Sequence, residues 1–177
     1  MLKLLAIVLF GLVVAVGALV AYAATKPDSF RVVRSLTIAA PPDRLFALIN
    51  DMRGFNRWNP YERKDPGRGT YGSAQAGIGA SYAWDSPKLG KGAMTIVDAA
   101  APGRVVMRLD FETPFKARNS ATFTIMPHDG GSEVSWAMEG PAPLVTKVMD
   151  TVIGMDKIIG GDFEEGLRNL KEIAEKP

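Results

Sequence analysis

The chain has 177 residues, with 21 basic and 19 acidic side chains and no cysteine. This length fits one ordinary domain behind a short terminal segment, and such a domain buries a core without disulfides or a structural metal. The lack of cysteine excludes cysteine catalysis, iron–sulfur clusters and thiolate zinc sites. Lys and Arg are interspersed with acidic residues and form no basic groove with aromatic residues, so we expect no nucleic-acid partner.

The N-terminal segment is strongly apolar. Leu4–Tyr22 carries no charge, and as a helix it would reach about 28 Å, which matches the hydrocarbon core of a bilayer. Lys3 and the small-x-small pattern that ends at Ala23 also fit a cleaved secretory signal. Because the apolar run is longer than an ordinary signal core, we interpret residues 1–24 as a transmembrane anchor, with a cleaved signal as the alternative.

The charges beside this segment do not fix its orientation. Lys3 precedes the apolar run, whereas Lys26, Arg31 and Arg34 follow it. In a bacterium, a short N-terminal anchor usually leaves the next domain outside the cytoplasm. We therefore expect an extracytoplasmic domain on a single-pass anchor, or a secreted or periplasmic protein if cleavage occurs near Ala23.

A polar linker at residues 25–29 separates this segment from one domain at residues 30–177. Phe30–Ile38 has the density of β-branched and apolar residues that is typical of a strand. Pro41-Pro42-Asp43 predicts a helix start, because proline fits the first helical turn and aspartate complements the positive helix N-terminus. The domain therefore begins with a strand followed by a helix.

Residues 52–60 are predicted to be irregular, with Phe55 and Trp58 as buried anchors. Strand and turn signals then continue to Glu139. The candidate strands are Thr70–Ala74, Ser81–Asp85, Met94–Ala99, Val105–Thr113, Arg118–Met126 and Glu133–Glu139. Their short connections predict antiparallel pairing, because parallel neighbours need crossovers of a dozen residues or more.

The rest of the chain predicts helix, which makes the domain α+β. Apolar residues recur on one side from Leu144, and Gly154 and Gly160-Gly161 are expected to interrupt the pattern. A second apolar stripe then predicts a terminal helix. The two stripes are Val145, Val148, Met149, Val152 and Ile153, and Phe163, Leu167, Leu170 and Ala174.

Several short sequence motifs follow one another in an order that resembles a known family. They are Pro41-Pro42-Asp43-Arg44-Leu45-Phe46, Phe55-x-x-Trp58-Asn59-Pro60, Tyr82-x-Trp84, Val134-Ser135-Trp136-x-Met138-x-Gly140 and Phe163-x-x-Gly166-Leu167-x-x-Leu170. Over residues 30–175 they resemble the polyketide cyclase/dehydrase-like proteins of the START-type, or SRPBCC, superfamily. The resemblance implies a helix-grip fold, in which a curved antiparallel sheet of six or seven strands wraps around a long C-terminal helix and encloses a hydrophobic cavity. It leaves the function open, because members include lipid carriers, hormone receptors and aromatic cyclases.

Strand alternation gives the strand side chains that would line such a cavity, and Trp58 and Phe163 are added from residues 52–60 and from the terminal helix. The candidates are Trp58, Tyr82, Trp84, Met94, Met107, Phe111, Phe123, Trp136, Met138 and Phe163. Aromatic and methionine side chains suit a lipid, quinone or polycyclic ligand, although any single one is more often core packing. Tyr82, Trp84 and Trp136 are favoured, because each carries a polar group that needs a partner when buried.

The sequence offers no convincing acid, base or nucleophile. His128, the only histidine, lies in a turn between two strands, where we expect an exposed side chain. The patterns Gly77-x-Gly79 and Gly90-x-Gly92 lack the strand-to-helix context of a nucleotide loop. We therefore expect neither a metal nor a cofactor.

Three functions remain open at this point. The first is a membrane-anchored, non-enzymatic protein that binds a hydrophobic small molecule such as a lipid or quinone. The second is an enzyme of the cyclase or dehydratase type, in which Tyr82 or Asp85 guides proton transfer on a polyketide-like substrate. The third is an envelope interaction protein with a closed cavity. Two titratable groups within hydrogen-bond reach inside the cavity would favour the enzyme.

Overall fold

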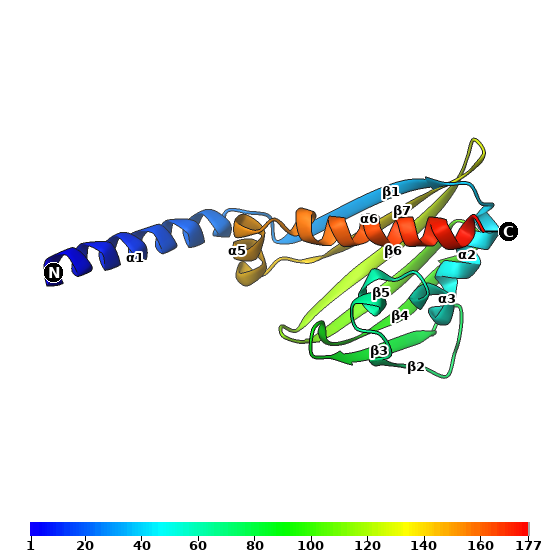
Figure 1. Cartoon of the computed structure of the whole chain (residues 1–177), viewed down its shortest axis with the longest axis horizontal. Coiled ribbons are helices and arrows are strands. Elements are labelled where there is room, and N and C mark those ends of the chain that lie inside the picture. Colours follow the sequence, from blue (N-terminus) through cyan, green and yellow to red (C-terminus); the bar gives the residue numbers. More distant parts are fainter. Residues whose placement is uncertain (177) are drawn as a thin grey trace.

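The computed structural model describes residues 1–176, which form six helices and one seven-stranded sheet (Figure 1). The helices are α1 (Leu2–Ala24), α2 (Pro42–Asn50), α3 (Met52–Asn56), α4 (Pro60–Lys64), α5 (Leu144–Val152) and α6 (Met155–Ala174). The strands are β1 (Ser29–Ile38), β2 (Gly69–Tyr71), β3 (Ser81–Ser86), β4 (Gly90–Ala100), β5 (Arg104–Thr113), β6 (Ala117–His128) and β7 (Gly131–Pro141). The helix α1 projects away from the rest of the fold.

All neighbouring strands pair antiparallel, in the order β1-β7-β6-β5-β4-β3-β2. The first and last strands of the chain are neighbours, with Ser29 opposite Pro141 and Ile38 opposite Ser132. The long helix α6 lies along the sheet and contacts β1 and β7 (Figure 1). This arrangement is the helix grip, so the predicted α+β fold class with an antiparallel sheet and a long C-terminal helix is confirmed.

The pairing of β4 with β5 is irregular at two points. The register shifts between Lys91 and Gly92 and again between Ile96 and Asp98. Such bulges bend a strand and increase its twist. They favour the curvature that lets the sheet wrap around α6.

Residues 52–60 contain one short helix and the start of another, so the prediction of an irregular stretch was wrong. α3 begins after Asp51, whose carboxylate accepts a hydrogen bond from the backbone N–H of Gly54 at 2.6 Å. α4 begins after Asn59, whose side-chain oxygen accepts one from the N–H of Tyr61 at 3.1 Å. Asp and Asn cap short helices as readily as they form turns. The second cap directs α4 against α6.

The long helix α6 continues through Gly160-Gly161, where an interruption was predicted. The chain breaks earlier, at Gly154, which has a φ of 80° and separates α5 from α6. A Cβ on Gly160 would lie 2.0 Å from Nη2 of Arg34. The lack of a side chain at Gly160 therefore allows the guanidinium of Arg34 to lie close to α6, and the helix continues through this residue.

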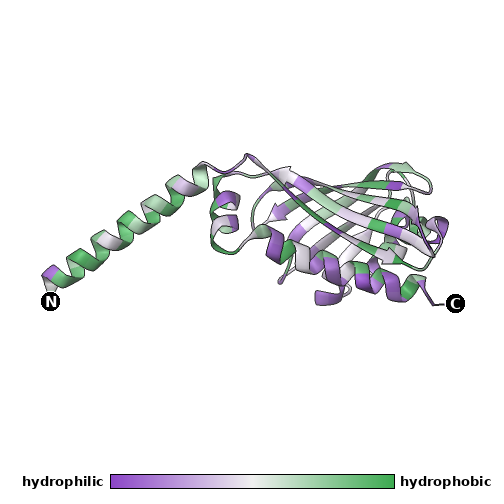
Figure 2. Ribbon diagram, turned by 90° about the horizontal axis from the view of Figure 1, so that it is seen from above, coloured by the Kyte–Doolittle hydropathy of each residue, from purple (hydrophilic) through white to green (hydrophobic). Residues whose placement is uncertain are grey.

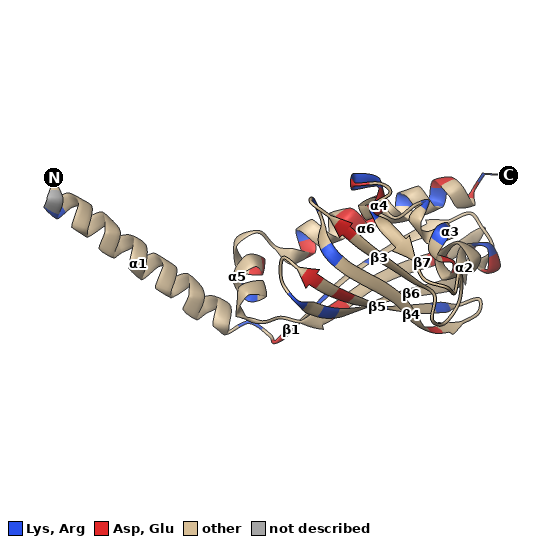
Figure 3. Cartoon of the chain, turned by 90° about the horizontal axis from the view of Figure 1, so that it is seen from below, with Lys and Arg blue, Asp and Glu red and all other residues tan. Residues whose placement is uncertain are grey.

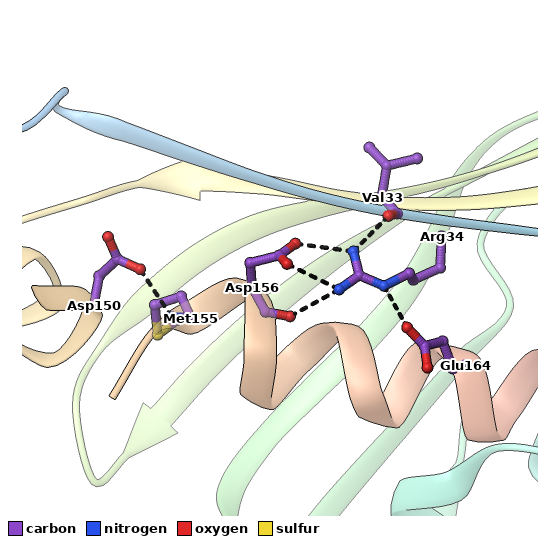
Figure 4. A network of polar contacts seen from close by, with 6 residues as sticks. All are labelled: Val33, Arg34, Asp150, Met155, Asp156 and Glu164. Carbon is purple, nitrogen blue, oxygen red and sulfur yellow. Dashed lines mark hydrogen bonds and ion pairs between the residues drawn. The ribbon is translucent and has the colours of Figure 1, made fainter. Parts of the chain in front are cut away.

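Arg34 ties β1 to the start of α6 (Figure 4). Its Nη1 and Nη2 each donate to the carboxylate of Asp156 at 2.9 Å, and its Nε donates to Glu164 at 2.7 Å. These bonds raise the pKa of Arg34, and the guanidinium holds the pKa of Asp156 below its usual range. One turn earlier, Asp150 accepts a hydrogen bond from the backbone N–H of Met155 at 2.8 Å. These contacts fix where α6 begins.

Two glycines of α6 give a matched test of this packing. A Cβ on Gly166 would lie 2.7 Å from Cζ3 of Trp136 and 3.0 Å from Cδ of Pro60, whereas one on Gly161 would meet no atom within 4 Å in residues 1–176. We expect Gly166→Ala to lower the free energy of unfolding by about 1–3 kcal/mol through overpacking. Gly161→Ala should raise it by about 0.5–1 kcal/mol, because alanine favours the helix. Denaturant unfolding of both variants measures the two changes in the free energy of unfolding. Equal changes would contradict the packing described for Gly166.

The core contains the two anchors predicted from residues 52–60. Phe55 is 3% exposed and Trp58 is fully buried, which confirms both. The ring of Trp58 meets Phe55 at 4.6 Å and Trp136 at 5.7 Å between centroids, in edge-to-face geometry. Its indole N–H donates to the carbonyl of Leu48 at 3.1 Å. Trp58 therefore connects α2, α3 and the sheet through ring packing and this hydrogen bond.

The projecting helix α1 is long and apolar enough to cross a membrane or to serve as a signal sequence. In Figure 2 most of the visible length of α1 has the colour of hydrophobic residues, and in Figure 3 the acidic residues and nearly all of the basic residues lie on the rest of the fold. Only the last turns of α1 are covered, where Leu19 and Val20 are half-buried and Ala23 is buried beside α5. The helix is therefore compatible with a retained transmembrane anchor and with a cleaved signal sequence, the two interpretations given from the sequence.

Candidate ligand-binding site

A cavity of about 400 Å³ lies between the sheet and the helices α4, α5 and α6. Most of the side chains that line it are apolar, and they come from strands β1 and β3–β7 as well as from the helices. A cavity of this size is in the range of small-molecule sites.

Nine of the ten residues predicted to line a cavity do line this one: Tyr82, Trp84, Met94, Met107, Phe111, Phe123, Trp136, Met138 and Phe163. Strand alternation located the eight that lie on strands, because inward and outward side chains alternate along each strand, and helical spacing located Phe163. The tenth, Trp58, lies in the core beneath the cavity, where Phe55, Phe123 and Trp136 enclose its ring. The role of the nine as ligand contacts stays a prediction.

The inner end of the cavity is aromatic. Trp136 stacks on Phe163, with ring centroids 4.0 Å apart and an angle of 10° between the planes, and Phe123 lies 5.0 Å from Trp136. Within the described residues, the buried indole N–H of Trp136 has no hydrogen-bond partner. The partner expected for this N–H stays a prediction, and the ring itself lies against Phe163 and Gly166 of α6.

Methionines form the sheet wall of the cavity. The strand register places Met94 opposite Leu109 and places Met107, Ala121 and Met138 in one row across β5, β6 and β7. Methionine adapts its shape to irregular ligands. Ala121 is the smallest side chain of this row, and the space beside it belongs to the cavity.

One wall of the cavity is polar. The hydroxyl of Tyr82 donates to the carboxylate of Glu62 at 2.5 Å, and both residues line the cavity. Burial, followed by the hydrogen bond to Glu62 and its charge, raises the pKa of Tyr82, so its hydroxyl stays protonated at neutral pH. The pair offers a proton donor beside a carboxylate.

A second polar group lies on the same side. Burial raises the pKa of Tyr61, and the nearby carboxylate of Asp162, which also takes its hydrogen bond, raises it further. Lys64 pairs with Asp162 at 2.5 Å. The cavity therefore combines an apolar sheet wall with a polar wall made of Tyr82 from β3, Tyr61 and Glu62 from α4, and Asp162 from α6.

Of this polar wall, only Tyr82 was predicted from the sequence. Glu62 and Tyr61 lie on α4, and the signal for that helix was Asn59-Pro60, a cap residue followed by proline. Asp85, the other residue considered for proton transfer, is exposed and does not belong to the lining. The reason is strand alternation, since its neighbour Trp84 faces the cavity.

The lining also includes Asp65 and Arg68, which pair at 3.5 Å, and Asn119, whose buried side-chain oxygen has no hydrogen-bond partner within residues 1–176. His128 is exposed at the end of β6, as predicted. In the described part of the chain, no three His, Asp or Glu side chains are grouped to bind a metal ion.

Fold and cavity together define a helix-grip protein with a small-molecule pocket. The profile of the family described as "polyketide cyclase / dehydrase and lipid transport" matches residues 29–175, and the chain belongs to this family. The predicted resemblance is thereby confirmed. A comparison with curated proteins gave no match.

Solved structures share this fold at low sequence identity. Protein CV1439 from Chromobacterium violaceum is 19% identical, with a TM-score of 0.60 over 86% of this chain and 100% of that chain. The di-domain ARO/CYC StfQ from the steffimycin biosynthetic pathway is 13% identical, with a TM-score of 0.60 over 83% of this chain and 51% of StfQ. The Aha1 dimer from Colwellia psychrerythraea is 11% identical, with a TM-score of 0.59 over 82% of this chain and 96% of that chain. At these identities the likeness shows the fold alone.

Proposed function

We propose that the protein is a membrane-anchored binding protein that holds a hydrophobic small molecule, such as a lipid or a quinone, in the cavity. The observation that carries the proposal is the cavity of about 400 Å³ with its apolar sheet wall. Burial of apolar ligand surface contributes roughly 25 cal/mol per Å², so such a lining favours an apolar ligand. The family description, which includes lipid transport, agrees with this class.

The apolar helix α1 supports the membrane part of the proposal. Retained as an anchor, it would keep the cavity where lipids and quinones are concentrated. Cavity-lining Phe115 and Met149 are 56% and 39% exposed, so the cavity reaches the surface beside α5. This opening argues against the alternative of an interaction protein with a closed cavity.

Uptake of a dansyl-labelled fatty acid tests the proposal. Trp84 and Trp136 line the cavity, so energy transfer from tryptophan to a bound dansyl group reports occupancy. We expect saturable transfer that an unlabelled fatty acid or a short-chain quinone reverses. Absence of saturable transfer, with the folded state verified by circular dichroism, would contradict the proposal.

The Glu62–Tyr82 pair favours a second candidate, an enzyme of the cyclase or dehydratase type. A protonated tyrosine beside a carboxylate can transfer a proton during ring closure or loss of water. StfQ, which shares the fold, is named as an ARO/CYC protein of a biosynthetic pathway. In this candidate the cavity would fold a reactive chain against the polar wall.

Tyr82→Phe separates the two candidates. The change removes the proton donor and keeps the ring, so a binding protein should retain its affinity for the dansyl fatty acid within about threefold, or less than 1 kcal/mol. An enzyme should lose conversion of its substrate by about 100-fold or more, as expected for loss of a general acid. Uptake and mass-spectrometric product analysis measure the two effects. Tyr71→Phe is the control, because its ring lies 4.9 Å from that of Tyr82 and does not line the cavity.

A further inference from the structure

The short helix α5 is amphipathic, but its charged side faces the protein and its apolar side faces outward, the opposite of a surface helix in a globular protein. Its charged side chains point toward the protein, where Lys147 is only 8% exposed and donates to Asp28 at 2.6 Å. Asp150 accepts a hydrogen bond from Lys26 at 2.8 Å. A surface helix in water presents its charged face outward, and α5 departs from this pattern.

The apolar stripe of α5 faces outward. Its members other than half-buried Val148, together with Leu144 and with Ile158 of α6, are between 39% and 64% exposed: Leu144, Val145, Met149, Val152, Ile153 and Ile158. A contiguous exposed apolar patch of this kind marks an interaction surface.

The position of α5 points to what covers this patch. The last turns of α1 pack against α5, and Lys26 and Asp28, just beyond α1, hold its charged face (Figure 1). A helix that crosses a bilayer ends at the interfacial layer. With α1 in the membrane, α5 would therefore lie at the depth of that layer, beside the last turns of α1.

The same end of the fold holds the mouth of the cavity. Leu89, Phe115, Met149 and Ile158 line the cavity where the hairpins β3–β4 and β5–β6 approach α5. The register confirms this grouping, because Lys91 lies opposite Thr113 and the hairpin turns lie just beyond these two residues.

Each of the three mouth segments pairs an apolar residue with a lysine. Leu89 follows Lys88, Phe115 precedes Lys116 and Ile158 follows Lys157, and all three lysines are exposed. Apolar side chains that enter the acyl boundary, next to lysines that reach the head groups, are typical of interfacial binding.

We infer that α5 lies in the interfacial layer of the bilayer, with its apolar face in the lipid, and that the cavity opens there and exchanges its ligand directly with the membrane. This inference rests on the proposed function, because it requires α1 to remain as an anchor and the cavity to take a lipid-soluble molecule. The lipid bilayer, and no second protein, is the partner of the α5 face.

Depth-dependent fluorescence tests the inference in the full chain reconstituted into phosphatidylcholine vesicles. The chain lacks cysteine, so Val152→Cys and Met126→Cys each provide a single site for an NBD label. The two residues are 64% and 51% exposed, and Met126 lies near the end of β6 away from α5. We expect the label at residue 152 to emit at shorter wavelength and to be quenched by doxyl-labelled lipids, and the label at residue 126 to be quenched by iodide in the water.

Two outcomes would overturn the inference. Quenching of residue 152 by iodide, as at residue 126, would show that α5 lies in water. A blue-shifted label at residue 152 that doxyl lipids do not quench would show that protein covers the face. Uptake of the dansyl fatty acid, measured on the same samples, is the test of the proposed function itself, so a failed depth result with normal uptake rejects the inference alone.

Ligand transfer provides a second measurement. Val152→Asp combined with Ile153→Asp should slow transfer of the dansyl fatty acid from vesicles to the protein by about tenfold or more, because charges oppose insertion into the acyl region. Met126→Asp should leave the rate unchanged. Equal rates in all three proteins would contradict direct exchange with the membrane.

Discussion

Trp58→Ala is expected to lower the free energy of unfolding by about 3–5 kcal/mol, the range for deleting a buried aromatic ring. The side chain is fully buried, contacts Phe55 and Trp136 edge-to-face, and donates its N–H to Leu48. Its removal leaves a void beneath the cavity and an unpaired backbone carbonyl. Denaturant unfolding followed by circular dichroism measures the loss.

Trp84→Ala is the matched control, because it deletes the same side chain from the cavity wall. Trp84 is half-buried and lies 5.7 Å from Phe111 between ring centroids. We expect Trp84→Ala to lower the free energy of unfolding by about 1–2 kcal/mol, since only part of the ring is removed from water in the folded state. If the two substitutions cost the same, Trp58 would not hold the core position described for it.

Ala121→Phe is expected to abolish ligand uptake while the domain stays folded. Ala121 lies between Met107 and Met138 in the row of the sheet wall, and the cavity extends beside it. A benzyl group at this position occupies ligand space. The affinity for the dansyl fatty acid should fall at least about tenfold, or 1.4 kcal/mol, in the energy-transfer titration.

Thr122→Phe adds the same ring one residue further along β6, on the opposite face of the sheet. It should leave uptake unchanged, and both variants should unfold cooperatively. Unchanged uptake in Ala121→Phe would mean that the ligand binds outside this cavity.

Much of the fold could be predicted because it depends on local periodicity. Alternation along β5–β7 gave the inward side chains, and short connections gave antiparallel pairing. Spacing at Phe163, Leu167 and Leu170 gave the terminal helix, and all three are buried. The apolar lining of the cavity followed from the same alternation.

Other features depend on tertiary contacts that no local pattern carries. Gly160 was predicted to break α6, but it makes room for Arg34, which comes from β1. Glu62 reaches Tyr82 only because α4 folds over the sheet. The outward direction of the α5 stripe has the same origin: helical spacing identified an apolar side, and only the fold determined that this side is exposed.

The two candidate functions would depend on different residues of the cavity. Binding would depend on the sheet wall around Met107 and Ala121, whereas proton transfer would depend on Glu62 and Tyr82. Substitutions on one wall therefore affect one candidate more than the other. Because of this separation, the proposed binding function can be tested before the natural ligand is identified.

Native mass spectrometry of the full chain, released from its membrane in mild detergent, shows whether the cavity holds a ligand. We expect a population whose mass exceeds that of the chain by one lipid-soluble molecule, identifiable after extraction and absent from Ala121→Phe. Wild-type protein that is consistently empty, or that carries the same molecule in Ala121→Phe, would contradict a ligand-holding cavity.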